Sequence, residues 1–125
     1  MLKRTVTAIA FMLVFCFSTR ATPPTDIIIT FDTAKSIVKA DIEHPTENPK
    51  QHFIYNIEVS VNGKKLIKQE ATEQLNTDIQ KVMYLIPGLK PGDKVSIYAE
   101  CNQYGDLTKE AVVPQIPAKD QTKKK

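Results

Sequence analysis

Hydrophobic and polar residues alternate with a period of two in two long segments of the chain. In residues 53–61 and again in residues 94–101, apolar or aromatic side chains occupy every second position. This period is typical of a β-strand that buries one face in a core. Both segments are therefore predicted to be strands. The residues expected to face the core are Phe53, Tyr55, Ile57, Val59 and Val61 in the first segment, and Val95, Ile97, Ala99 and Cys101 in the second.

Five shorter segments rich in β-branched residues complete the pattern. Asn62-Gly63 predicts a tight hairpin turn, and two Pro-Gly pairs in residues 87–93 predict another turn. Residues 71–80 have only a weak pattern and are predicted to be a connection. Seven strands without a helix predict an all-β protein, an immunoglobulin-like antiparallel β-sandwich. The five shorter strand segments are residues 26–31, 36–42, 64–71, 81–86 and 107–113.

The first 21 residues have the features of a secretory signal peptide. Lys3 and Arg4 precede an apolar stretch at residues 5–17, and small residues follow, with cleavage expected after Ala21. We therefore expect an exported protein, periplasmic or secreted. The β-sandwich domain is expected to span residues 22–118, and the lysine-rich residues 119–125 to form a flexible tail.

Removal of the signal peptide changes the charge balance. It takes away three of the 17 basic residues and none of the 14 acidic ones, so the mature chain carries 14 of each. No basic patch with interleaved aromatic residues remains, which argues against a nucleic-acid partner. No second apolar stretch reaches membrane length, so we expect no membrane association after cleavage.

The mature chain keeps a single cysteine, Cys101, and the chain has only two histidines, His44 and His52. A lone cysteine cannot form an internal disulfide, so Cys101 is buried and inert, paired to another chain, or bound to a metal. Imidazole nitrogen and thiolate sulfur suit iron, copper or zinc. The spacing alone matches no known ligand pattern. Two solvated loop histidines and a small core cysteine are the alternative interpretation.

Three short motifs resemble those of the superoxide reductase family, the iron domain of desulfoferrodoxin and neelaredoxin. They are "EHP" at 43–45, "HFIYNIEVSVNGK" at 52–64 and "AECNQYG" at 99–105. The resemblance covers roughly residues 37–113 and implies an immunoglobulin-like sandwich with a mononuclear non-haem iron. That family holds the iron with four histidines and one cysteine and reduces superoxide to peroxide. By resemblance, the ligands here are His44, His52 and Cys101.

Two of the family's five ligands lack a counterpart in this chain. Tyr104 stands where the last histidine is expected, and residues 22–30 contain neither the first histidine nor the lysine that attracts superoxide. Tyr104 either ligates as a phenolate or packs as an aromatic lid over the pocket. Three acidic residues lie near enough in sequence to complete the shell: Glu43, Glu47 and Glu100.

The resemblance thus implies a metal-binding domain of an oxidoreductase family with an incomplete ligand set. Whether the chain is an enzyme stays open, and no catalytic residue is assigned beyond the metal ligands. If active, it would act on superoxide or another small redox substrate. Its electrons would come from an electron-donor or carrier protein.

A non-catalytic binding or carrier module is the alternative function. The chain also resembles, more faintly, the immunoglobulin-like subunit of the thiosulfate-oxidation carrier complex, which shares a His-Pro segment, an apolar strand ending near "NGK" and a late glycine turn. That family pairs with a partner subunit and binds no metal. Its members have no Cys-Asn pair before the last turn, whereas this chain has Cys101-Asn102 there, which favours the first function.

Overall fold

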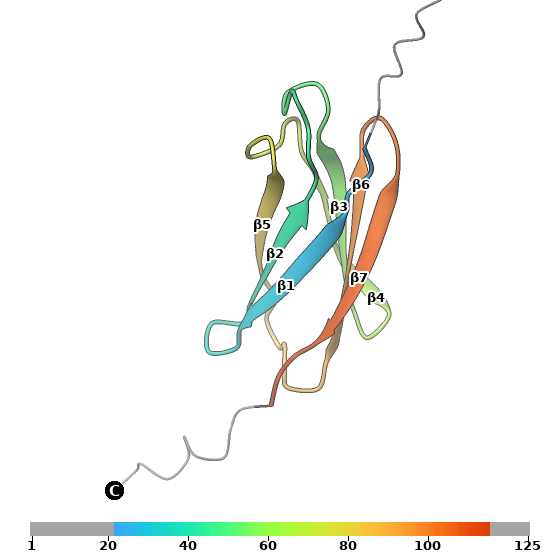
Figure 1. Ribbon diagram of the computed structural model, residues 1–125. Helices are drawn as coiled ribbons and strands as arrows, with labels where there is room; N and C mark the ends of the chain where they lie inside the picture. Colours follow the sequence, from blue (N-terminus) through green and yellow to red (C-terminus); the bar gives the residue numbers. More distant parts are fainter. Residues whose placement is uncertain (1–21, 116–125) are drawn as a thin grey trace, which may run out of the picture.

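A computed structural model describes residues 22–115, which form two antiparallel sheets packed face to face (Figure 1). The three-stranded sheet has the order β1-β2-β5, and the four-stranded sheet has the order β4-β3-β6-β7. The predicted all-β sandwich of seven strands is confirmed. The strands are β1 Asp26–Asp32, β2 Ile37–Glu43, β3 Ile54–Val61, β4 Lys64–Glu70, β5 Ile79–Leu85, β6 Lys94–Cys101 and β7 Asp106–Val112.

The turns form where the sequence predicts them. Asn62 and Gly63 both have positive φ, 50° and 83°, and connect β3 to β4. Such angles suit a tight hairpin because their twist matches that of the flanking strands. Residues 71–78 form the predicted connection, but Ile79 and Gln80 already belong to β5. The prediction that residues 71–80 are all connection was therefore wrong at its end.

The core lies between the two sheets and draws on both. In β6, all four residues of the predicted inward face are buried, which confirms the alternation there. Cys101 is the last of them and is 4% exposed. The buried apolar residues are Ile27, Val38, Ala40, Ile42, Ile54, Ile57, Val59, Val82, Tyr84, Ile86, Val95, Ile97, Ala99, Cys101 and Val113.

The alternation predicted for the start of β3 was wrong. Ile54 is fully buried and Tyr55 is only partly buried, although the period of two placed Tyr55 inward. The cause is a bulge: Ile54 pairs with Cys101 and Asn56 with Glu100, so Tyr55 is an extra residue. A bulge adds one residue to one strand and shifts the alternation beyond it. It sets Ile54 directly opposite Cys101.

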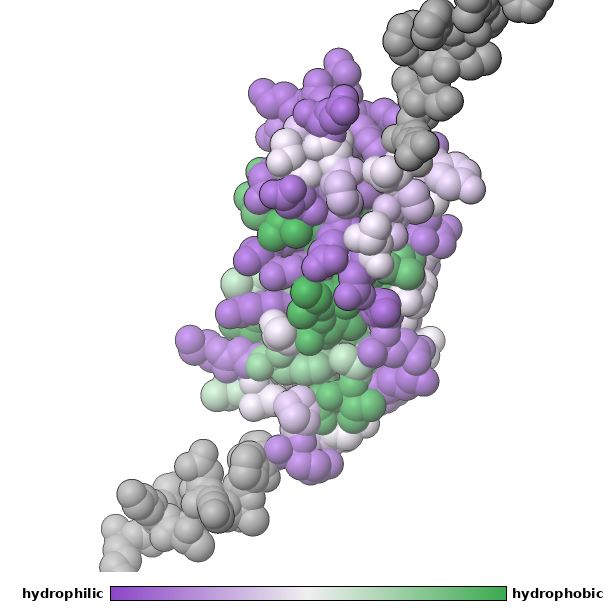
Figure 2. Space-filling view, viewed as in Figure 1, coloured by the Kyte–Doolittle hydropathy of each residue, from purple (hydrophilic) through white to green (hydrophobic). Residues whose placement is uncertain are grey.

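The surface of the sandwich mixes polar and apolar residues, and the apolar ones on the face in Figure 2 form patches between polar side chains. Within residues 22–115, no helix is long and apolar enough to cross a membrane. The predicted signal peptide (residues 1–21) and lysine-rich tail (residues 119–125) lie outside the described residues, as do the last three residues of the predicted domain.

Candidate metal centre

The three predicted ligands meet at one end of the sandwich. His44 follows β2, His52 precedes β3, and Cys101 ends β6. One ligand atom from each residue lies within 4.8 Å of the other two. The two imidazole rings contact each other edge to face, with centroids 4.6 Å apart and planes at 83°. The structure therefore brings together residues that are 57 positions apart in the sequence.

His44 reaches this point because it continues the inward face of β2. Val38, Ala40 and Ile42 occupy every second position of that strand and are fully buried. His44 is the next residue of the same series and is also 0% exposed. Its backbone N–H donates to the Asp78 carbonyl at 2.9 Å, which extends the pairing by one residue. The period of two that predicts β2 thus also predicts the burial of this imidazole.

Gln74 fixes the orientation of the His44 ring. The Gln74 amide is 3% exposed, and its Nε2 donates to the carbonyls of His44 (2.8 Å) and Asn76 (3.0 Å). Its Oε1 must then face His44 Nδ1, which lies 2.8 Å away. In the tautomer with the proton on Nδ1, His44 donates to Gln74, and Nε2, which lies 2.8 Å from the Thr22 carbonyl, is the atom available for a metal. A metal-binding histidine usually donates its other ring N–H to such an oxygen.

His52 is held by its loop, and its Nε2 atom has no hydrogen-bond partner among the described residues. The His52 backbone N–H donates to the Asn48 carbonyl at 2.9 Å, whereas Nε2 is buried without a hydrogen bond. Burial lowers the pKa of His52, and the neighbouring His44 lowers it further, while the Thr22 carbonyl partly opposes both effects. The lowered pKa favours the neutral imidazole, which is the form that binds metals.

Cys101 lies in a turn that is tied to the segment before His52. Asn102 accepts from the Phe53 N–H at 3.0 Å and donates to the Gln51 carbonyl at 2.9 Å. The Gln103 N–H donates to Cys101 Sγ at 3.4 Å. Cys101 is a free, buried cysteine.

Tyr104 and the three glutamates stand apart from this cluster. Tyr104 is 66% exposed, so its ring lies mostly in solvent and does not form the predicted lid. Its ligation as a phenolate stays a prediction. Among residues 22–115, the cluster of His, Cys, Asp and Glu side chains able to hold one ion contains only the two histidines and the cysteine. None of Glu43, Glu47 and Glu100, the acidic residues near the ligands in sequence, belongs to this cluster.

Sequence reasoning missed two residues of the centre, Gln74 and Thr22. The Thr22 carbonyl lies 2.8 Å from His44 Nε2, and Gln74 lies in the connection that had only a weak pattern. Both act on His44 from more than 20 residues away in sequence. No local pattern predicts such contacts, because they depend on how the sheets pack.

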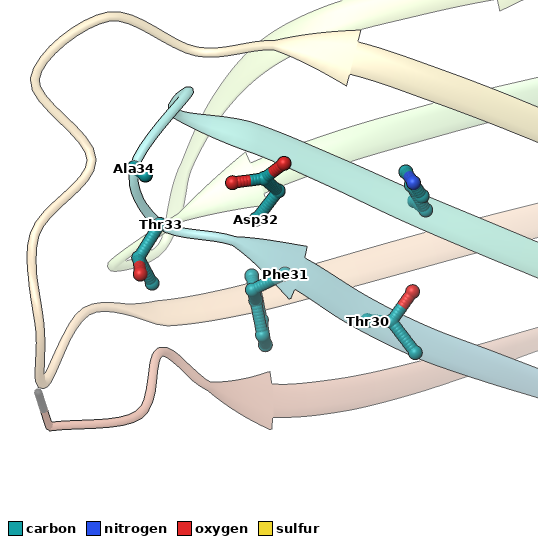
Figure 3. Close-up of a pocket in the computed structure, with 6 residues that line it drawn as sticks. Thr30, Phe31, Asp32, Thr33 and Ala34 are labelled. Atoms are coloured by element: carbon teal, nitrogen blue, oxygen red, sulfur yellow. The ribbon is translucent and has the colours of Figure 1, made fainter. Parts of the chain in front are cut away.

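A pocket at the opposite end of the sandwich lacks comparable features. It surrounds the turn between β1 and β2, where the labelled side chains are small, apolar or exposed to solvent (Figure 3). Its carboxylate, Asp32, pairs with Lys35 at 3.8 Å. No histidine or cysteine lines it, so the metal centre is the better candidate. The lining residues are Thr30, Phe31, Asp32, Thr33, Ala34 and Lys39.

Comparisons with known proteins find similarity among solved structures. The sequence matches no protein-family model and no curated protein. A solved structure, the superoxide reductase from Nanoarchaeum equitans, aligns over 74% of this chain and 94% of its own, with 19% identity and a TM-score of 0.42. This similarity is too low to assign a function to the chain.

Proposed function

We propose that this chain is an exported, superoxide-reductase-like domain whose His44, His52 and Cys101 hold one mononuclear iron ion. The observation that supports the proposal is the convergence of three soft or borderline donor atoms, from two buried residues and one partly buried residue, within 4.8 Å of one another. The motifs that carry these residues are the ones that resemble the superoxide reductase family.

The chemistry of the three side chains fits a metal-binding role better than a purely structural role in the core. A buried polar atom without a partner costs about 1–3 kcal/mol, and His52 Nε2 is such an atom. A bound cation would offset this cost. Cys101 Sγ accepts the Gln103 N–H, and His44 has the oxygen partner expected behind a ligating imidazole. Two imidazoles and one thiolate suit iron, as they also suit copper and zinc.

Bound iron would supply the one-electron reduction of superoxide to peroxide, with two protons from solvent and one electron from a donor protein. The chain itself orients the ligands. Gln74 holds the His44 ring, and Asn102 ties the Cys101 turn to the segment before His52. Because three side-chain donors converge among the described residues, a bound metal would keep positions for superoxide or another small redox substrate.

Metal analysis of protein produced in iron-supplemented medium, together with its visible spectrum, tests the proposal. We expect close to one iron per chain and a thiolate-to-iron absorption band, both lost in Cys101→Ser. Ala99→Ser is the matched control, because it places the same hydroxyl on the same inward face of β6 and should keep the metal.

A well-folded protein that is colourless and cannot be loaded with any metal would overturn the proposal. If that protein also purified with a tightly bound partner, and Cys101→Ser left this binding unchanged, the non-catalytic carrier module would be the better interpretation.

A further inference from the structure

Residues 22–25 cross the end of the sandwich that holds the metal centre, and we call them the N-terminal strap. Figure 1 shows that β1 begins at the end where the loops before β3, β5 and β7 gather. The Thr22 hydroxyl donates to the Pro45 carbonyl at 2.8 Å, and the Thr25 N–H donates to the Glu43 carbonyl at 2.8 Å. Pro24 is buried. The strap is therefore fixed on both sides of His44.

The strap also contacts the turn that carries Cys101. Gly105 has a φ of +86°, and a Cβ atom built there would lie 2.4 Å from the Pro23 Cβ and 3.2 Å from the Pro23 Cα. Real Cβ atoms do not approach other carbons so closely, so only glycine lets Pro23 pack here. The strap thus bridges the His44 segment and the Cys101 turn.

This placement directs the Thr22 carbonyl oxygen at the ligating nitrogens. The oxygen lies 2.8 Å from His44 Nε2, and the His44 ring contacts the His52 ring with centroids 4.6 Å apart. Both ring nitrogens of His44 therefore face oxygen atoms that can only accept, Gln74 Oε1 at Nδ1 and the Thr22 carbonyl at Nε2. A metal ion held jointly by Nε2 and the carbonyl oxygen would satisfy the second contact.

The separation of the two atoms is also suitable for shared ligation. Two adjacent ligands that each lie about 2.1 Å from one metal ion are about 3 Å from each other. We propose that the Thr22 main-chain carbonyl is the fourth donor of the metal centre, held in place by the N-terminal strap. This inference rests on the proposed function, because it needs the site formed by His44, His52 and Cys101. The completed set is two imidazoles, one thiolate and one amide oxygen.

The sequence allows this one carbonyl to be observed alone. Thr22 is the only threonine followed by a proline. Protein labelled with carbonyl-¹³C threonine and ¹⁵N proline therefore gives a single coupled carbonyl signal, that of Thr22. Zn²⁺ serves as a diamagnetic probe. We expect the Thr22 signal to shift in step with metal loading and to stop at one equivalent. A signal that stays unchanged at saturation would overturn the proposal.

A pair of glycine variants tests the strap itself. Gly105→Ala should push Pro23 away and weaken Zn²⁺ binding tenfold or more. Gly88→Ala is the matched control, because Gly88 has nearly the same φ, +83°, but an added Cβ meets nothing within 4 Å. Both variants share the backbone strain, so only the displaced strap separates them. We expect Gly88→Ala to bind Zn²⁺ within twofold of the unchanged protein.

The outcomes separate the two proposals. If the unchanged protein binds Zn²⁺ through Cys101 but Gly105→Ala binds equally well, the strap is no ligand and the three-residue centre stands. If neither the unchanged protein nor Gly88→Ala binds metal, both proposals fail. If Gly105→Ala does not fold, the Thr22 carbonyl signal of the unchanged protein decides the question.

Discussion

The two ends of the sandwich both bury polar side chains, but they satisfy them differently. At the end where β3 turns into β4, Asp93 is 6% exposed and accepts from the Asn62 amide and from the Lys90 N–H, each at 3.0 Å. At the other end, His52 Nε2 is buried with no partner. At the first end, the buried polar groups form the hydrogen bonds that close the turns. At the second end, an unpartnered nitrogen lies beside two other donor atoms, which is what a ligand site needs.

An unpartnered atom alone does not make a site. Tyr84 also has a buried hydroxyl without a partner, and burial raises its pKa to about 12. Its ring packs in the hydrophobic core, whereas the His, Cys, Asp and Glu side chains that could hold one ion in residues 22–115 are His44, His52 and Cys101. The comparison therefore depends on convergence: His52 differs from Tyr84 because His44 and Cys101 point to the same place.

The largest effect at the metal end is expected from Gln74→Leu. This change removes four hydrogen bonds and leaves buried groups of His44 and Ile54 without partners. We expect the free energy of unfolding to fall by about 3 kcal/mol, as measured by chemical denaturation of the metal-free protein. Metal affinity should fall about 10–100-fold, because the His44 ring loses its support.

Gln69→Leu in β4 is the control for Gln74→Leu. Gln69 is only partly buried and its side chain makes no hydrogen bond within the described residues, so the change should alter stability by less than about 0.5 kcal/mol. If Gln74→Leu proved equally harmless, the buried amide would not be what holds His44.

The second prediction separates the two ends by pH. Burial lowers the pKa of His52 from its ordinary 6.5, so the unfolded chain takes up a proton that the folded chain resists. By linkage, the metal-free protein loses stability as the pH falls below about 6.5. The Lys90 N–H and the Asn62 amide hold the pKa of Asp93 below its ordinary 3.8. Its contribution is therefore present above pH 3.8 and is lost only as the pH falls further.

Denaturation curves of the metal-free protein across this pH range check both windows. His52→Leu should remove the loss of stability between about pH 7 and 5 and leave the loss below pH 3.8 in place. Asp93→Asn should change the loss of stability below pH 3.8 and leave the loss between about pH 7 and 5 in place. If His52→Leu kept the loss of stability between about pH 7 and 5, the two ends would not differ in the predicted way.

The sequence predicts the sheets better than it predicts the ends. Alternation in β6 and the Asn62-Gly63 turn depend on neighbours in sequence, so they can be read locally. The bulge at Tyr55 depends on how β3 pairs with β6, and no neighbour signals it. Gln74 and Thr22 act on His44 across the fold. Their roles follow from tertiary packing, so polar residues in patternless segments were the ones that the sequence left unassigned.

The smallest effect is expected from Tyr104→Phe, which sharpens the comparison at the metal end. The Tyr104 ring is 66% exposed, so the loss of its hydroxyl should change the free energy of unfolding by less than about 0.5 kcal/mol. With the ring in solvent, we also expect the visible spectrum of the iron-loaded protein to stay the same. A phenolate ligand would instead give a charge-transfer band that disappears in Tyr104→Phe. Loss of such a band would show that the Cys101 turn closes over the metal, and that the exposed ring turns inward when iron binds.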